Sequence, residues 1–143
     1  MAGEKGAVYS SDILKLVFNS TALSWNAATN LYLSLHTADP GVGGSQTTNE
    51  AAYTGYARTS LTRSGTSAFT VSTSTGAANS VVLAAGLSFP SCTGGSSTVT
   101  YFAIGISSTG AGELLYAGPV SPTIAVSSGV IPQLTTGTAI TES

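Results

Sequence analysis

Short runs of alternating apolar and polar residues dominate this sequence, and turn residues interrupt them at roughly 8–12 positions. The clearest run covers residues 31–36, where the leucines share one face and Tyr32, Ser34 and His36 share the other. Such alternation indicates a half-buried β-strand. Many short strands with frequent turns favour an antiparallel sandwich or barrel. We therefore predict a mainly β fold, a jelly-roll-like antiparallel β-sandwich of about eight strands with a short N-terminal helix.

The other strands are expected between clusters of Gly, Pro, Ser and Thr, which mark turns. They cover residues 57–63, 68–72, 79–84, 97–106, 113–117, 123–127, 130–135 and 138–141. The run from Tyr101 to Ile106 is apolar on both faces, as expected for a central strand that is covered on both sides. Pro119 and Pro122 are expected to interrupt the strand pairing between their neighbours.

The N-terminus reads differently from the rest of the chain. Residues 1–10 are small and polar, and we expect an extended arm. Ser11 offers a capping hydroxyl and Asp12 an acid for a first helical turn. The apolar residues that follow predict a short amphipathic helix, which fades near Asn19 and is too short to be stable unless it packs against something. With 143 residues, the whole chain suits a single domain, 1–143.

Charge is scarce in this chain. Charged residues make up 7% of it, against about 25% in an ordinary globular domain, and Ser and Thr make up about 30%. A surface of neutral hydroxyls costs far less to desolvate than a surface of ions. We infer that much of the surface contacts other protein. The alternative is that Ser and Thr simply suit exposed β faces.

The composition also argues against several kinds of partner. The four basic residues, Lys5, Lys15, Arg58 and Arg63, are scattered, so they do not form the clustered footprint that binds nucleic acid directly. The single Cys92 rules out a disulfide framework and a cysteine-based zinc site. No apolar run reaches the ~20 residues that span a bilayer, and the start of the chain lacks the apolar stretch of a signal peptide. We expect neither nucleic-acid nor membrane binding.

No catalytic or metal-binding pattern is present. His36 is the single histidine, and its place opposite the leucine face predicts a surface or interface residue. The nucleophile elbow Gly-x-Ser-x-Gly is missing. The acids show no ligand spacing; they are Glu4, Asp12, Asp39, Glu50, Glu113 and Glu142. We expect no enzyme, no cofactor and no metal.

One cluster has the composition of a protein-binding site. Tyr53, Tyr56 and Arg58 lie within six residues, next to a long loop at 37–50. Tyrosine and arginine are enriched in binding hot spots. The hypothesis is that this cluster contributes to a protein–protein contact, so alanine substitutions should weaken assembly and leave melting unchanged. The alternative is packing of the next strand, in which case folding would be lost.

Several segments resemble small virion structural proteins of tailed bacteriophages. The most specific are residues 30–41, Asn-Leu-Tyr-Leu-Ser-Leu-His-Thr-Ala-Asp-Pro-Gly, and residues 46–58, which end in Tyr-Thr-Gly-Tyr-Ala-Arg. Residues 89–95 and 102–105 fit the same pattern, and the likeness runs from about residue 10 to the end. Members of this group are often labelled tail-fibre or hypothetical phage proteins. Some look like capsid cement (decoration) proteins with a jelly-roll fold.

This resemblance implies a virion protein that decorates the capsid exterior and stabilises it by binding the major capsid protein, after assembly in the host cytoplasm. A homodimer or homotrimer is expected. The N-terminal arm, with Val8 and Tyr9, would add a strand to a neighbour or simply fray. The alternatives are a tail or tail-fibre component and a carbohydrate-binding β-sandwich module. An enzyme comes last.

Overall fold

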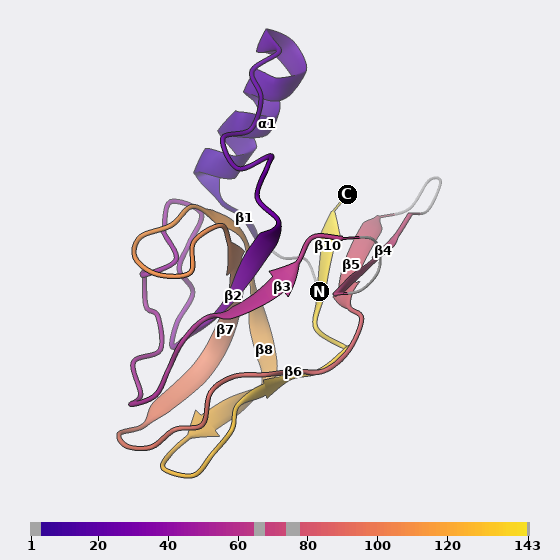
Figure 1. Ribbon diagram of the computed structural model, residues 1–143. Coiled ribbons are helices and arrows are strands. Elements are labelled where there is room, and N and C mark those ends of the chain that lie inside the picture. The colour runs from indigo at the N-terminus through magenta and orange to yellow at the C-terminus, as the bar shows by residue number, and fades with distance from the viewer. Residues whose placement is uncertain (1–3, 65–67, 74–77, 143) are drawn as a thin grey trace.

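The computed structural model describes residues 4–64, 68–73 and 78–142, which form ten strands and one helix. Five strands make an antiparallel sheet in the order β1-β8-β7-β2-β3 (Figure 1). Their bounds are β1 Glu4–Lys5, β8 Leu114–Val126, β7 Ser97–Gly105, β2 Asn30–His36 and β3 Thr59–Thr62. A three-stranded sheet has the order β10 (Ala139–Glu142), β5 (Asn79–Leu83), β4 (Phe69–Ser72), and β6 (Leu87–Ser88) pairs with β9 (Gln133–Leu134).

The core lies between the large sheet and the two small ones. Leu33 and Leu35 of β2 and Phe102 of β7 pack in one buried cluster with Leu83 of β5 and Leu134 of β9. The shared leucine face predicted for β2 is therefore confirmed. So is the mainly β, antiparallel, sandwich-like class with a short N-terminal helix. Every expected strand overlaps an observed one, and β1 and β6 are two-residue strands beyond those expected.

The second face of β2 is not a surface, contrary to the prediction for His36. Ser34 and His36 are fully buried. The reason is that the loop after β2 folds back over this face. Glu50 bridges His36, and the N–H of Ala51 donates to the carbonyl of Leu35 at 2.8 Å.

The prolines interrupt the pairing of β8 with β7, as expected: Ile124 pairs with Val99 and Pro119 with Tyr101, and residues 120–123 between them have no partner in β7. The strand itself is nevertheless continuous. The strand runs for 13 residues through Pro119 and Pro122, and Pro119 lies opposite Tyr101 of β7. Within the described residues, β1 pairs only with Tyr116 and Ala117 on the other side of β8. A strand edge without a neighbour tolerates proline, because no ladder hydrogen bond is lost there.

Helix α1 (Ala7–Asn19) begins four residues earlier than Ser11, the predicted start. Gly6 is the N-cap, and its own N–H donates to the carbonyl of Leu115 at 3.0 Å. Residues 4 and 5 pair with β8 of the same chain. The expected extended arm is thus a short strand followed by helix at 7–10, and residues 1–3 lie outside the described part. Tertiary anchoring to β8 sets this start rather than a side-chain cap.

Candidate functional site

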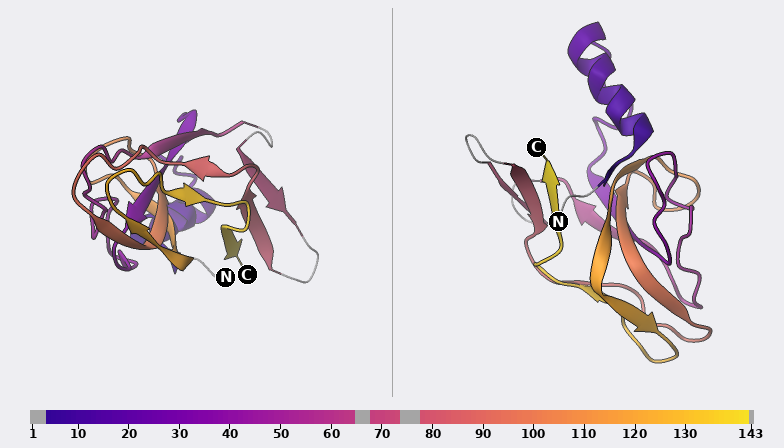
Figure 2. Two further views of the ribbon diagram at one scale, coloured as in Figure 1. Left: turned by 90° about the horizontal axis from the view of Figure 1, so that it is seen from below. Right: turned by 180° about the vertical axis from the view of Figure 1, so that it is seen from behind.

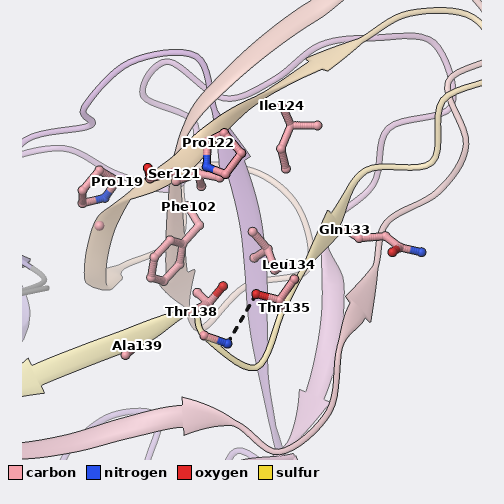
Figure 3. A pocket seen from close by; sticks show the side chains of 13 residues that line it. Phe102, Pro119, Ser121, Pro122, Ile124, Gln133, Leu134, Thr135, Thr138 and Ala139 are labelled. Atoms are coloured by element: carbon pink, nitrogen blue, oxygen red, sulfur yellow. Dashed lines mark hydrogen bonds between the residues drawn. The ribbon is translucent and has the colours of Figure 1, made fainter.

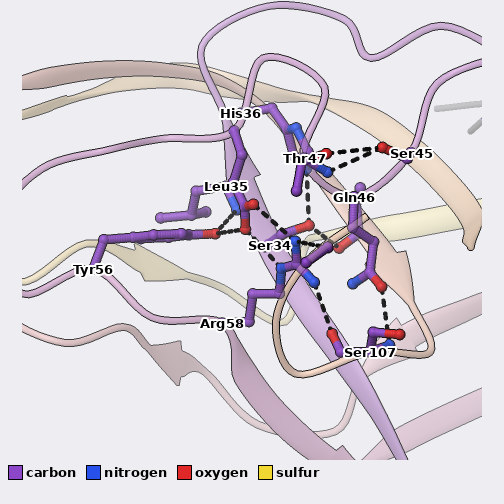
Figure 4. A network of polar contacts seen from close by, with 12 residues as sticks. Ser34, Leu35, His36, Ser45, Gln46, Thr47, Tyr56, Arg58 and Ser107 are labelled. Carbon is purple, nitrogen blue, oxygen red and sulfur yellow. Dashed lines mark hydrogen bonds and ion pairs between the residues drawn. The ribbon is translucent and has the colours of Figure 1, made fainter. Parts of the chain in front are cut away.

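A buried ion pair lies at the centre of a polar network beneath the loop that follows β2 (Figure 4). The Arg58 guanidinium holds the Glu50 carboxylate with two bonds, Nε to Oε1 at 2.7 Å and Nη2 to Oε2 at 2.8 Å. The same guanidinium donates to the carbonyls of Ser107 at 2.9 Å and Gly110 at 2.7 Å. The Arg58 side chain is 2% exposed. Fork-to-fork geometry of this kind fixes orientation as well as charge, so Arg58 ties two loops together.

Two tyrosines extend the network into the core. The Tyr56 hydroxyl donates to Glu50 Oε1 at 2.9 Å and accepts from the N–H of Leu35 at 3.1 Å. Burial raises the pKa of Tyr56 far above its usual value, so the hydroxyl stays protonated. Tyr53 is buried, packs edge-on against Tyr56, and donates to the carbonyl of Pro90 at 2.9 Å. Both tyrosines thus pack against the core and hold neighbouring segments through their hydroxyl groups.

His36 and Ser34 form a hydrogen-bonded pair, with 2.8 Å between Nε2 and Oγ. His36 Nδ1 lies 2.8 Å from the carbonyl of Thr48. A carbonyl only accepts, so Nδ1 carries the proton and Nε2 accepts from the serine hydroxyl. The distance is one that a nucleophile and its base would have. Both residues are fully buried, however, and a backbone carbonyl stands where an orienting carboxylate would be. This pair holds the loop against the sheet.

Gln46 contacts the same segment as Arg58, at Ser107, and is fully buried. Its Oε1 accepts from the N–H of Ser107 at 2.9 Å, whereas Nε2 has no hydrogen-bond partner among the described residues. Gly105 and Gly112 make room for it, since a Cβ at either position would lie 2.1 or 2.3 Å from a Gln46 side-chain atom. The close approach therefore depends on glycine at both places.

The structure brings the predicted residues Tyr53, Tyr56 and Arg58 together, with Tyr53 and the Arg58 side chain buried and Tyr56 partly buried. Because these side chains carry part-buried hydrogen bonds, we now expect alanine substitutions there to lower the melting temperature, in contrast to the sequence-based expectation. A direct contact of this cluster with a partner stays a prediction, and burial leaves it little surface for one. The sequence analysis did not identify Glu50 as the ion-pair partner of Arg58. The signal available for it was an acidic residue at the end of the predicted loop, eight residues before the arginine.

The buried His36 makes stability depend on pH. Burial lowers the pKa of His36 below its usual 6.5, opposed by the hydrogen bond to Thr48 and by the charge of Glu50. The unfolded chain thus takes up this proton first as the pH falls. We expect the free energy of unfolding to be highest above pH 6.5 and to fall below it, in urea titrations at pH 7.5 and 5.5. A His36→Gln variant serves as control and should lose this pH slope, whatever its absolute stability; an unchanged slope would contradict the assignment.

Helix α1 is the other unusual feature, because it projects from the sheets rather than packing on them (Figures 1 and 2). Its base is held by Tyr9, whose ring lies 5.2 Å from that of Tyr116 and 5.9 Å from that of Trp25. No residue of the helix is buried against the described part of the chain. Large apolar side chains are exposed along it; these are Val8, Leu14, Leu16, Val17 and Phe18.

The two N-terminal interface candidates have different surroundings. Tyr9 is half-buried and anchors the helix, so it acts inside the chain. Val8 is 58% exposed, and its contact with a partner stays a prediction. In the described residues, no group of three or more His, Cys, Asp or Glu side chains gathers as a metal site would need. The described helix is also too short to cross a membrane.

One comparison with known proteins is informative. A protein-family model described as "Podophage GP4 fiber I protein gp80" matches residues 6–141, whereas no curated protein matches the chain. The match agrees with the phage resemblance and with its fibre label, but it does not extend to the capsid cement family. Because it spans nearly the whole chain, the protein belongs to this podophage fibre I family and is a structural protein of a phage particle.

Proposed function

We propose that this chain is a tail-fibre component that works through protein–protein contacts and not by catalysis. The observation that carries the proposal is the family match over residues 6–141, whose description names a fibre protein. A fibre subunit needs a rigid body and a surface that joins it to other subunits. In this chain the sandwich supplies the rigid body, and helix α1 supplies the surface.

The rigid body is the sandwich with its buried polar network. Glu50, Arg58 and Tyr56 fix the long loop from within. Buried networks whose members are satisfied rigidify a fold. The joining surface is helix α1, where exposed apolar side chains stand away from the sheets. Contiguous exposed apolar patches mark interaction sites.

Capsid decoration and a contact with the major capsid protein form the other candidate, and no feature of the described residues favours it over a fibre. The position of the protein on the particle separates the two. We expect the chain at roughly tens of copies per particle, set by the rotational symmetry of the tail, and we expect antibody against it to label the tail in electron micrographs. Quantitative mass spectrometry against the major capsid protein gives the copy number. Hundreds of copies with label over the shell would refute the fibre assignment in favour of decoration.

A further inference from the structure

The tip of helix α1 carries one continuous apolar face. Leu14, Val17 and Phe18 are spaced i, i+3 and i+4, so they lie side by side on the helix. They are 59%, 64% and 77% exposed. Lys15 and Asp12 pair with each other at 3.6 Å. Asp12 lies on the opposite side of the helix, whereas Lys15, three residues before Phe18, borders the apolar face. This face therefore presents three apolar side chains, with the paired Lys15 at its edge.

The same chain has an uncharged pocket, lined by apolar and polar side chains, that its own side chains leave open (Figure 3). Its volume is about 410 Å³. Phe102 and Leu134 contribute from the core side, Pro122 and Ile124 of β8 form one wall, and Thr135 stands in the segment between β9 and β10. No charged residue lines it. The pocket is thus uncharged, with apolar side chains beside the polar Ser121, Gln133 and Thr138, and it lies next to a strand edge that is free among the described residues.

We propose that the tip of α1 of one copy inserts Leu14, Val17 and Phe18 into this pocket of a second copy. The helix projects beyond one end of the sheets, whereas the pocket lies between β8 and the start of β10 (Figures 1 and 2). A rigid helix anchored at Tyr9 and directed away from the body does not reach the pocket of its own chain. The helix of the same chain is therefore not the occupant, and a second copy supplies the same three side chains.

Size and charge suit this occupant. An apolar cavity of about 150 Å³ takes up a benzene molecule, so a cavity of about 410 Å³ has room for the Phe18 ring and an aliphatic neighbour. Neither surface brings an unpaired ion, so no charge is buried without a partner. Lys15, at the edge of the contact, is paired with Asp12.

The surface area that one helix–pocket contact buries indicates which form of assembly is stable. A helix of 13 residues is about 20 Å long and about 11 Å wide, so half of its side covers about 350 Å². One contact buries at most about 700 Å² on both partners together, less than the ~1,200 Å² of a stable pair. In a closed ring each copy makes two such contacts, one with its helix and one with its pocket, and the contact that closes the ring forms within one assembly, at a high effective concentration, so small contacts suffice. Head-to-tail contacts of this type close into rings or extend as filaments, so we expect such an assembly rather than an isolated dimer.

The test uses the purified full-length chain and sedimentation velocity across a concentration series. The wild type is expected to assemble beyond a dimer. Phe18→Asp removes the knob and Thr135→Trp fills the pocket, and each should leave a monomer at a concentration at which the wild type is assembled. Thr135 is exposed, so the larger ring should not disturb the core. If Thr135→Trp fails to fold by circular dichroism, Gln133→Trp, at another exposed position of the lining, replaces it.

Matched controls carry the same changes outside the contact. Val8→Asp replaces another exposed apolar residue of α1, and Thr136→Trp adds the same ring next to the pocket but outside its lining. Both should assemble like the wild type. A mixture of Phe18→Asp and Thr135→Trp retains one intact helix tip and one intact pocket per pair. It is expected to form nothing larger than one-to-one dimers, which appear only toward the highest concentrations because a single contact is small.

Three results would overturn the contact. A monomeric wild type at every concentration removes it altogether. Assembly that survives Thr135→Trp but not Phe18→Asp shows that the helix binds another helix or another surface. A mixture that stays monomeric even at the highest concentration of the series shows that tip and pocket do not meet. The contact gives the proposed fibre subunit its self-association, but the test is made on the free protein; a tail position with a monomeric chain would retain the proposed function and reject this contact.

Discussion

Glu50→Ala is expected to lower the free energy of unfolding by about 3–5 kcal/mol, since it leaves the Arg58 guanidinium buried without its carboxylate. That guanidinium is 2% exposed, so water does not replace the lost partner. The Tyr56 hydroxyl also loses its acceptor. For a chain of this length the loss corresponds to a fall in melting temperature of roughly 10–20 °C. Urea titration at pH 7.5 with circular dichroism measures the free energy, and a thermal scan measures the melting temperature.

Two controls separate this effect from a general effect of losing a charge. Asp12→Ala breaks the surface pair with Lys15, which is 53% exposed, and should cost less than about 0.5 kcal/mol. The double variant Glu50→Leu with Arg58→Met should lose less than Glu50→Ala, because it leaves no unpaired ion inside. If Glu50→Ala costs no more than Asp12→Ala, Arg58 reaches solvent and the ion pair does not hold the loop.

Gly6→Ala is expected to cost about 1–3 kcal/mol or more and to displace helix α1. A Cβ on Gly6 would lie 1.9 Å from the carbonyl oxygen of Leu114, which belongs to the backbone of β8 and cannot turn aside as a side chain can. The junction of β1 and α1 must therefore move away from β8. Tyr9 would then lose its contact with Trp25, the single tryptophan. Thermal melting gives the cost, and intrinsic fluorescence gives the displacement.

Gly43→Ala is the matched control, since a Cβ there meets nothing within 4 Å. It should change stability by less than about 0.5 kcal/mol and leave the fluorescence spectrum as in the wild type. Equal melting and equal spectra for the two variants would show that the junction at Gly6 has room that the structure does not give it.

Local patterns predicted the strands well, because strand formation in a sandwich depends mainly on one buried face. The alternation at 31–36 placed β2 and its leucines correctly. The same pattern failed for His36, since the polar face of a strand is buried when another segment folds over it, and that depends on residues 46–50. The prolines of β8 marked the interruption of its pairing with β7 correctly, because a proline has no N–H for a neighbouring strand, whereas the continuity of β8 through them was not visible in the sequence.

The candidate site divides in the same way. Residue type identified Tyr53, Tyr56 and Arg58. It does not distinguish an exposed side chain that binds a partner from a side chain that packs inside the protein. The partner that decides it, Glu50, comes from the loop that folds over β2. The apolar residues of α1 were likewise visible in the sequence, whereas their exposure was not.

By itself, the sequence determined a mainly β chain of short antiparallel strands, an N-terminal helix and a surface poor in charge, because periodicity and composition act locally. Tertiary structure alone decided which faces are covered, where the helix begins and which apolar residues stand free. Those outcomes depend on contacts between segments far apart in the chain, such as Arg58 with Ser107 and Gly6 with Leu115. The free energy of such contacts is set by geometry that no local pattern encodes.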